Sequence, residues 1–321
     1  MEVAEGIHRI EAPFGDRVNA TYLLAGTRAA LLVDTTTKDT AATHIGGYLD
    51  RIDLDPHRLR YVVNTHSDWD HMAGNGAIRA LAPDAVFCCH ELDRPMIEDV
   101  DRMIDRRYGD FAADHGHDET DEAKAAVRAA TETVPIDVGL TGGEVIDLGS
   151  GWRVTVLHTP GHSWGSISVH DPRSGAVVVG DAVLGDAVPT AAGAPAFPPT
   201  YRYLDTYLAT IGLLTALAPR LLLTGHYPVY AADEAAEFLY LSRAFTDRVE
   251  SALRAELAER SEPVTLRELT TVLGPRLGDW PVEATAALFF PLSGHVERLV
   301  AHGAVDTGRD ADGHLTYRSA R

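Results

Sequence analysis

Lysine and cysteine are scarce in this chain of 321 residues. Lys38 and Lys124 are the only lysines, so nearly all of the 28 basic side chains are arginines. The only cysteines, Cys88 and Cys89, are adjacent. Adjacent cysteines exclude the disulfide framework of small secreted domains, and they favour two buried thiols in a reducing compartment.

Long apolar runs are also lacking. No stretch approaches the roughly 20 apolar residues needed to cross a bilayer, and the N-terminus MEVAEGIHRIEAPFGD is acidic where a signal peptide would be basic and then apolar. We therefore expect a cytoplasmic protein with no membrane partner. Hydrophobic residues make up 45% of the chain, enough for one large domain or two smaller ones.

Positive charge is in deficit. Against 28 basic side chains stand 47 acidic ones, a net charge of −19. A field of this sign repels polyanions, so we expect a small-molecule substrate and no nucleic-acid partner. The composition is compatible with a homo-oligomer but does not predict one.

The order of elements predicts an α/β fold. Short strands and turns fill residues 7–34, and the apolar strand RLRYVVNT ends in the polar segment HSDWDH. Residues 91–133 are typical of a charged helical insertion, and strands return up to RLLLTGH. From about residue 261 the order is helix, loop, helix, hairpin, which resembles a winged helix. We expect a catalytic domain over residues 1–230 and a helical, winged-helix-like module over residues 231–321.

Histidines and aspartates gather where four predicted strands end. The seven are His66, Asp68, Asp70, His71, His162, Asp181 and His226. Imidazoles and carboxylates are ligands for zinc and other first-row metals, and seven are enough for two ions that share one bridging carboxylate. The pattern therefore indicates a metal centre.

The order of these residues, HSDWDH followed by His162, Asp181 and His226, resembles the motifs of the metallo-β-lactamase superfamily. Its usual HxHxDH motif corresponds to HSDWDH here, and its later single His, Asp and His correspond to His162, Asp181 and His226; the early VDT, with Asp34, is also similar. The resemblance covers roughly residues 6–230. It implies an αββα sandwich with two divalent ions, most commonly zinc, at one sheet edge. It further implies that His66, Asp68 and His162 hold one ion, that Asp70, His71 and His226 hold the other, and that Asp181 bridges them.

Asp68 departs from that pattern, because most members have a histidine there. In flavodiiron proteins and some di-iron oxygenases of the superfamily a glutamate stands at this position. One interpretation is that Asp68 binds metal, which makes the site harder, less electrophilic and more suited to manganese or iron. The other is that Asp68 does not bind metal and holds a partner by hydrogen bonds.

A competing motif is GHSWG, residues 161–165, which fits the G-x-S-x-G nucleophile elbow of α/β-hydrolases, with Asp181 and His226 in the right chain order. An elbow requires a helix directly after the serine. Because SISVHDPRSGAVVVGD alternates as strands do, we do not expect Ser163 to be a nucleophile.

Aromatic residues near the motifs are candidates for substrate contacts. Trp69 and Trp164 flank proposed ligands, and Phe197, Tyr201 and Tyr203 lie between the Asp181 and His226 motifs.

Residues 261–321 carry six arginines and eight acidic residues, so the C-terminal module lacks the basic face of a DNA-binding winged helix. The string LFFPLSGHVERLVAHGAV resembles the C-terminal region of lactamase-β-like hydrolases, a branch that includes an endoribonuclease.

The sequence thus predicts a binuclear metal-dependent hydrolase that cleaves an ester, a thioester or a lactone. A metal-bound hydroxide, oriented by Asp70, would attack the carbonyl carbon, with Asp70 and His71 as the catalytic residues. The first alternative is an oxidative di-iron enzyme of the same fold, suggested by the carboxylate at Asp68. An endoribonuclease is the second alternative, which the acidic chain disfavours.

Overall fold

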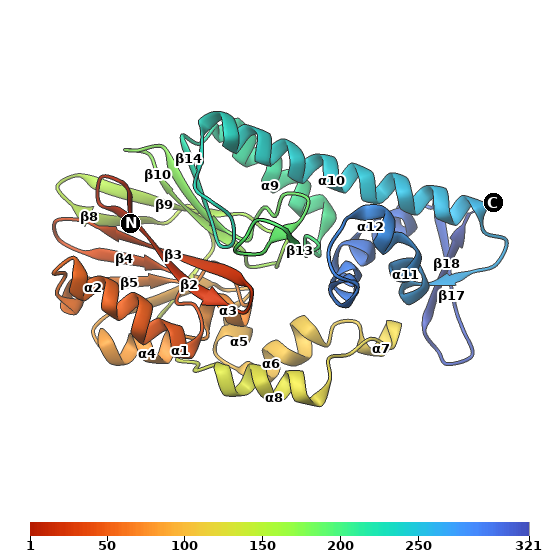
Figure 1. Cartoon of the computed structure of the whole chain (residues 1–321), viewed down its shortest axis with the longest axis horizontal. Helices are drawn as coiled ribbons and strands as arrows, with labels where there is room; N and C mark the ends of the chain where they lie inside the picture. Colours follow the sequence, from red (N-terminus) through yellow and green to blue (C-terminus); the bar gives the residue numbers. More distant parts are fainter. Residues whose placement is uncertain (321) are drawn as a thin grey trace.

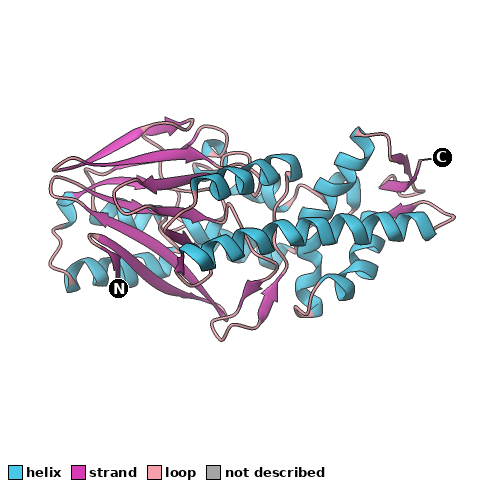
Figure 2. Cartoon of the chain, turned by 90° about the horizontal axis from the view of Figure 1, so that it is seen from above, coloured by secondary structure: helices cyan, strands magenta, loops and turns pink. Residues whose placement is uncertain are grey.

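The structure is a computed structural model that describes residues 1–320. Two sheets face each other in one half of the molecule, on the left in Figures 1 and 2. The first has the order β1-β2-β3-β4-β5-β6-β7. Its strands are β1 (Glu2–Ala4), β2 (Ile7–Phe14), β3 (Arg17–Ala25), β4 (Ala30–Val33), β5 (Leu59–Val63), β6 (Val86–His90) and β7 (Val138–Leu140).

The second sheet has the order β15-β14-β11-β10-β9-β8. Its strands are β8 (Val145–Gly149), β9 (Trp152–His158), β10 (Ile167–Asp171), β11 (Ala176–Gly180), β14 (Leu221–Thr224) and β15 (Tyr230–Ala231). Parallel pairing joins β4, β5 and β6 in the first sheet, and β11 and β14 in the second. Parallel strands are covered on both faces, and accordingly every residue of β4 and β11 is buried.

Helices cover the outer face of each sheet, so the layers run α, β, β, α (Figure 1). One cluster of apolar side chains fills the space between the sheets, and two others lie under the helices. The helices over the first sheet are α1 (Lys38–Thr40), η1 (Ala41–Gly46), α2 (Gly47–Arg51), η2 (Pro56–Arg58), α3 (Trp69–Met72) and α4 (Asn75–Leu81). The predicted αββα sandwich is confirmed.

Residues 91–133 form a row of short helices along one side of the sandwich (Figure 1). They are α5 (Arg94–Ile97), α6 (Val100–Met103), η3 (Ile104–Tyr108), α7 (Ala112–His115) and α8 (Asp121–Ala130). The Pro- and Ala-rich segment 187–200, expected as a loop, carries the small hairpin β12 (Val188–Pro189) and β13 (Pro195–Phe197).

The second sheet is covered by α9 (Leu204–Leu217) and by α10 (Ala232–Glu259), which runs on to the C-terminal elements (Figure 2). Those elements are β16 (Val264–Thr265), α11 (Leu266–Leu277), η4 (Val282–Leu288), α12 (Phe289–Ala301), β17 (Val305–Arg309) and β18 (Leu315–Ser319). The expected order of helix, loop, helix and hairpin is found. One apolar cluster joins β11, α9, α10, α11 and α12, so the C-terminal elements share a core with the outer face of the second sheet. A domain boundary at residue 230 stays a prediction.

Within residues 1–320, Cys88 and Cys89 are buried free thiols on β6, as expected. No helix of the described part combines the length and apolarity that a membrane crossing requires.

Candidate metal centre

The seven predicted donors come together at one end of the two sheets. The segment after β5 carries His66, Asp68, Asp70 and His71 into α3, and Asp181 directly follows β11. His162 lies in the turn between β9 and β10, and His226 lies just after β14. Because β5 is a parallel strand of the first sheet and β11 and β14 are parallel strands of the second, their carboxyl ends deliver these side chains to a common edge. The donors fall into three overlapping groups: His66–His71–Asp181, His66–Asp68–His162 and Asp70–His71–His226.

Three donors of the second proposed site, Asp70, His71 and His226, lie within reach of one ion, and Asp181 contacts both of these histidines. His226 Nε2 lies 3.3 Å from His71 Nε2, 3.3 Å from Asp181 Oδ2 and 3.4 Å from Asp70 Oδ2. His71 Nε2 lies 3.5 Å from Asp181 Oδ1 and 3.7 Å from Asp70 Oδ2. Metal–ligand bonds of about 2.0–2.2 Å in tetrahedral geometry separate ligand atoms by about 3.3–3.6 Å. This group therefore fits a divalent cation.

Two donor atoms of the centre have no hydrogen-bond partner among residues 1–320, although both are buried. They are His66 Nε2 and Asp181 Oδ1. A buried polar atom without a partner costs free energy, which a bound cation would recover. These two atoms therefore support the fit of a metal ion to the centre.

Asp34 fixes the orientation of His71. Its Oδ2 lies 2.9 Å from His71 Nδ1, and its two oxygens accept hydrogen bonds from the Thr65 backbone N–H and the Thr65 hydroxyl. A carboxylate behind a ligating imidazole leaves Nε2 free to face the metal and makes it a better donor. Asp34 has a φ of 66°, the left-handed region that side chains rarely adopt, so backbone strain accompanies this placement.

Negative charge is concentrated around His71. Burial disfavours the imidazolium form, but the carboxylates of Asp181, Asp70 and Asp34 outweigh this and raise the pKa of His71 to about 10. Burial likewise disfavours the charged form of His226, but the carboxylate of Asp181 outweighs burial and raises the pKa of that imidazole. A pocket that stabilises an imidazolium this strongly also attracts a metal cation.

Asp68 forms an ion pair with Arg107, a residue that was not predicted from the sequence to belong to the site. Arg107 Nε donates to Asp68 Oδ1 at 2.7 Å, and Arg107 Nη2 donates to Asp68 Oδ2 at 3.1 Å. The second oxygen also lies 2.9 Å from His162 Nε2. Burial alone would raise the pKa of Asp68, but Arg107 and His162 hold it well below its usual range. The carboxylate is thus an anion in a two-pronged ion pair.

Arg107 is fixed on all sides although it comes from the insertion. It lies on η3 and is 6% exposed. Its Nη1 donates to the His162 backbone carbonyl at 3.1 Å, and its guanidinium lies 4.5 Å above the ring of Phe290 from α12. The first proposed site, His66–Asp68–His162, therefore fits a metal less well than the second, because two of its three donors already contact a guanidinium.

The centre opens into a cavity of about 380 Å³. Its walls come from β2, the insertion, the β12–β13 hairpin and the C-terminal elements, and include Phe14, Arg17, Tyr108, Glu283 and Phe290. Trp69 and Phe197 also line it, so both stay candidates for substrate contacts. Glu283 and Phe290 were not named as individual candidates, because their distance along the sequence from the motifs gives no signal for single residues.

The other predicted substrate contacts lie elsewhere. Tyr201 is fully buried, stacks on Tyr207 and bonds His295 Nε2 at 2.9 Å, so the expectation that it contacts substrate is wrong: it packs the core. Trp164 and Tyr203 stack on each other with ring centroids 4.0 Å apart, and they are not among the residues that line this cavity. Their contact with substrate stays a prediction.

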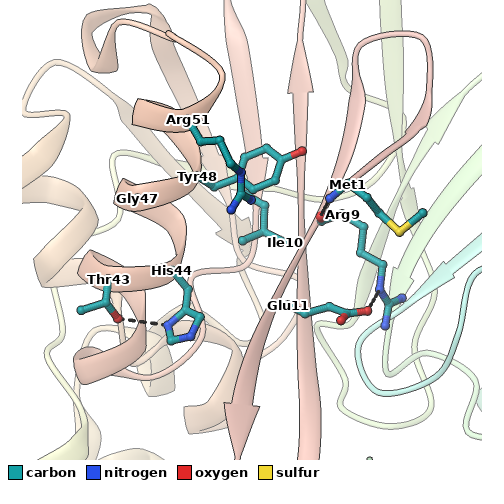
Figure 3. Close-up of a pocket in the computed structure, with 9 residues that line it drawn as sticks. All are labelled: Met1, Arg9, Ile10, Glu11, Thr43, His44, Gly47, Tyr48 and Arg51. Atoms are coloured by element: carbon teal, nitrogen blue, oxygen red, sulfur yellow. Dashed lines mark hydrogen bonds and ion pairs between the residues drawn. The ribbon is translucent and has the colours of Figure 1, made fainter.

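A different cavity lies between β2 and the η1–α2 segment (Figure 3). Its polar groups are already paired: Arg9 bonds Glu11 at 2.8 Å, and Thr43 Oγ1 bonds His44 Nδ1 at 3.0 Å. With a single histidine on its wall, it does not resemble the metal centre.

Ser163 faces Asp93 and not the histidines of the centre. Its hydroxyl donates to Asp93 Oδ2 at 2.6 Å and contacts Ser166 Oγ at 2.8 Å, and the chain continues through a turn into β10. Asp93 also accepts the backbone N–H groups of Ser67 and Gly165. This network ties α5 to the turns that carry the ligands, so Ser163 has a structural place.

We expect Ser163→Ala to keep hydrolytic activity within about tenfold of the wild-type chain, with a stability loss of about 1 kcal/mol from the broken hydrogen bond. Steady-state kinetics and urea unfolding check both values. A thousandfold loss of activity in a folded variant would instead support Ser163 as the nucleophile.

Comparisons with known proteins concern the family and the fold of the chain. The sequence profile of the metallo-beta-lactamase superfamily matches residues 14–226. None of the curated proteins compared with the chain matched it.

Several solved structures share the fold. The metallo-beta-lactamase family protein TTHA1429 from Thermus thermophilus is 23% identical, with a TM-score of 0.76 and 99% of both chains covered. A beta-lactamase domain protein from Burkholderia ambifaria is 19% identical, with a TM-score of 0.75, covering 100% of this chain and 93% of the other. A Cronobacter sakazakii metallo-beta-lactamase with a HARLDQ motif is 16% identical, with a TM-score of 0.59, covering 79% of this chain and 95% of the other. Because the profile match spans more than half of the sequence and includes all seven donors, the chain belongs to the metallo-beta-lactamase superfamily.

Proposed function

We propose that the chain is a metal-dependent hydrolase of small esters, thioesters or lactones. The observation that carries the proposal is the pair His71 and His226, whose Nε2 atoms lie 3.3 Å apart and 3.3–3.7 Å from oxygens of Asp70 and Asp181, at the base of a cavity that is open to a small molecule. When bound there, a divalent cation, zinc being the first candidate, supplies a Lewis acid for the carbonyl oxygen and an acidified water molecule.

The protein supplies orientation. Asp34 aims His71 Nε2 inward, and the Val18 carbonyl, 3.0 Å from His226 Nδ1, does the same for His226. The Asn19 amide donates to the backbone carbonyl of Asp70 and fixes the start of α3. With their second ring nitrogens engaged in this way, both imidazoles present Nε2 as the metal-facing atom.

Asp70 has the position of a group that can accept or orient a proton. It is 8% exposed, and its Oδ2 points to both histidines while its side chain also lines the cavity. A carboxylate so placed touches both the ligand cluster and an incoming substrate, which is the geometry a general base requires.

The cavity walls favour a neutral acyl compound with an apolar part. Phe14, Trp69, Phe197 and Phe290 offer aromatic surface, and Arg17 covers the rings of Phe14 and Phe197 at 4.6 and 5.2 Å. Carboxylates at Glu119 and Glu283 on the same wall disfavour a polyanion. This distribution supports an ester, thioester or lactone over a ribonucleic acid.

The oxidative di-iron alternative loses its main support. It depended on Asp68 as a harder oxygen ligand, but both oxygens of Asp68 accept hydrogen bonds from Arg107. A carboxylate engaged in this way has less electron density to offer an iron ion.

The test is a substrate panel on the purified full chain, containing aryl esters, acyl thioesters and lactones of graded chain length. Hydrolysis of at least one class should disappear after dialysis against a chelator and return on addition of Zn²⁺ or Mn²⁺. Hydrolysis that survives complete metal removal would refute the proposal, as would an iron-loaded chain that consumes oxygen and cleaves none of the panel.

A further inference from the structure

Arg107 occupies the side of the centre where the first ion is expected. Besides pairing with both oxygens of Asp68, its Nη2 lies 2.9 Å from His162 Nε2. That nitrogen is also 2.9 Å from Asp68 Oδ2, so Asp68, His162 and Arg107 are in mutual polar contact, and Nε2 is engaged whether it accepts from Arg107 or donates to Asp68. Of the three donors expected for the first ion, only His66 Nε2 remains without a partner in the described residues.

A cation at this position would lie close to the guanidinium. An ion bonded to His162 Nε2 at about 2.0–2.1 Å, with Arg107 Nη2 at 2.9 Å from the same nitrogen, lies within about 5 Å of Arg107. The two like charges would face each other in a buried site, where solvent screens them poorly. Arg107 cannot move aside freely, because Phe290 covers it and the His162 carbonyl holds Nη1.

Arg107 already supplies positive charge on this side of the centre. The three donor carboxylates, Asp68, Asp70 and Asp181, have side-chain exposures of 13%, 11% and 8%, and Asp34 adds a fourth buried carboxylate behind His71. One divalent ion together with Arg107 brings three positive charges against these four negative ones, so most of the buried charge is balanced before a second ion binds.

We propose that Arg107 takes the place of the first metal ion, so that the chain binds a single divalent cation between Asp70, His71, Asp181 and His226. Asp68 then serves as the counter-ion that anchors Arg107, and not as a ligand. The wall where a second Lewis acid would lie instead presents a fixed guanidinium. The inference concerns the same centre as the proposed hydrolase, but it rests on metal stoichiometry and does not require that any substrate be cleaved.

The test is a metal titration of the metal-free full chain. Zn²⁺ binding is followed by isothermal titration calorimetry and by elemental mass spectrometry after removal of free ions, and Co²⁺ is followed by its electron paramagnetic resonance spectrum. The wild-type chain should saturate at about one ion, with a cobalt spectrum of isolated ions. Saturation at two ions, or a spectrum of two spin-coupled ions, would overturn the inference.

A double variant supplies the converse. Asp68→His together with Arg107→Ala rebuilds a three-histidine group at His66, position 68 and His162, and removes the competing cation. It should bind about two ions where the wild-type chain binds one. Arg106→Ala, an exposed arginine next to Arg107 on η3, is the matched control and should leave the count at one.

The outcomes separate this inference from the proposed function. One tightly bound ion without hydrolysis of any panel substrate supports the inference and contradicts the proposed function. Hydrolysis with two bound ions supports the proposed function and contradicts the inference. If the double variant fails to fold, as shown by circular dichroism, the wild-type stoichiometry and the cobalt spectrum still decide.

Discussion

Replacing Asp181 with asparagine should lower kcat/KM for the best substrate of the panel by a thousandfold or more. Asp181 touches both histidines of the cluster, at 3.5 Å from His71 Nε2 and 3.3 Å from His226 Nε2. Asparagine keeps the shape of the side chain but removes its negative charge, so the metal loses an anionic ligand and binds more weakly. Rate losses of this size follow when a group that stabilises the charge of the transition state is removed, each tenfold loss corresponding to about 1.4 kcal/mol.

Kinetics and the metal content of the purified Asp181→Asn variant test this together. The matched control is Asp312→Asn, in the turn between β17 and β18, where Asp310, Asp312 and His314 form another group of donor atoms that is partly exposed. The control should keep both the activity and the metal count. A folded Asp181→Asn variant with more than a tenth of wild-type activity would remove Asp181 from the centre.

The second large effect concerns stability. Phe245→Ala on α10 should lower the free energy of unfolding by about 3–5 kcal/mol, since the substitution empties the space of a fully buried aromatic ring. Phe245 lies with ring centroids 6.3 Å from both Tyr201 and Trp280, so it joins the segment after the β12–β13 hairpin to the C-terminal elements. Because all three belong to one apolar cluster, the C-terminal elements and the second sheet should lose stability together.

Urea unfolding followed by tryptophan fluorescence and circular dichroism measures this effect. Tyr240→Ala is the matched control, because Tyr240 stands on the same helix with 69% of its surface exposed, and it should change stability by less than about 0.5 kcal/mol. Two separate transitions in the wild-type chain, with Phe245→Ala shifting only one of them, would contradict a shared core.

The sandwich and the ligand positions could be predicted from the sequence for a physical reason. Each donor follows an apolar strand or a turn between strands, and the carboxyl ends of parallel strands in a layered fold meet at one edge. His66, Asp181 and His226 are therefore placed by local pattern alone. The structure brings them together as expected, with His71 between them.

Arg107 could not be predicted in the same way. Four arginines lie between residues 94 and 107, and a charged helical segment is usually a solvated surface. Only the packing of η3 against the centre turns Arg107 inward while Arg106 stays exposed. Its partner Asp68 did give a signal. A carboxylate stands there where the motif usually has a histidine, and one interpretation was that this carboxylate holds a partner by hydrogen bonds.

The side-chain orientation of Tyr201 could not be predicted from the sequence either. It lies in a segment where pocket walls were expected, but its hydroxyl pairs with His295 from α12, far along the chain. The sequence shows that an aromatic residue is near the motifs but not which way its ring points, because a tertiary contact decides that.

The placement of Phe290 over Arg107 has a consequence for how this protein could diversify. The wall of the cavity formed by Glu283, Ala286, Ala287 and Phe290 belongs to η4 and α12, whereas the seven donors belong to the sandwich. Substitutions at Glu283, Ala286 and Ala287 can therefore remodel the substrate entrance while the ligand geometry stays intact, whereas Phe290 also holds Arg107 in place. In a directed-evolution experiment, part of the selectivity would therefore be open to change in a stretch of the gene that encodes none of the seven donors.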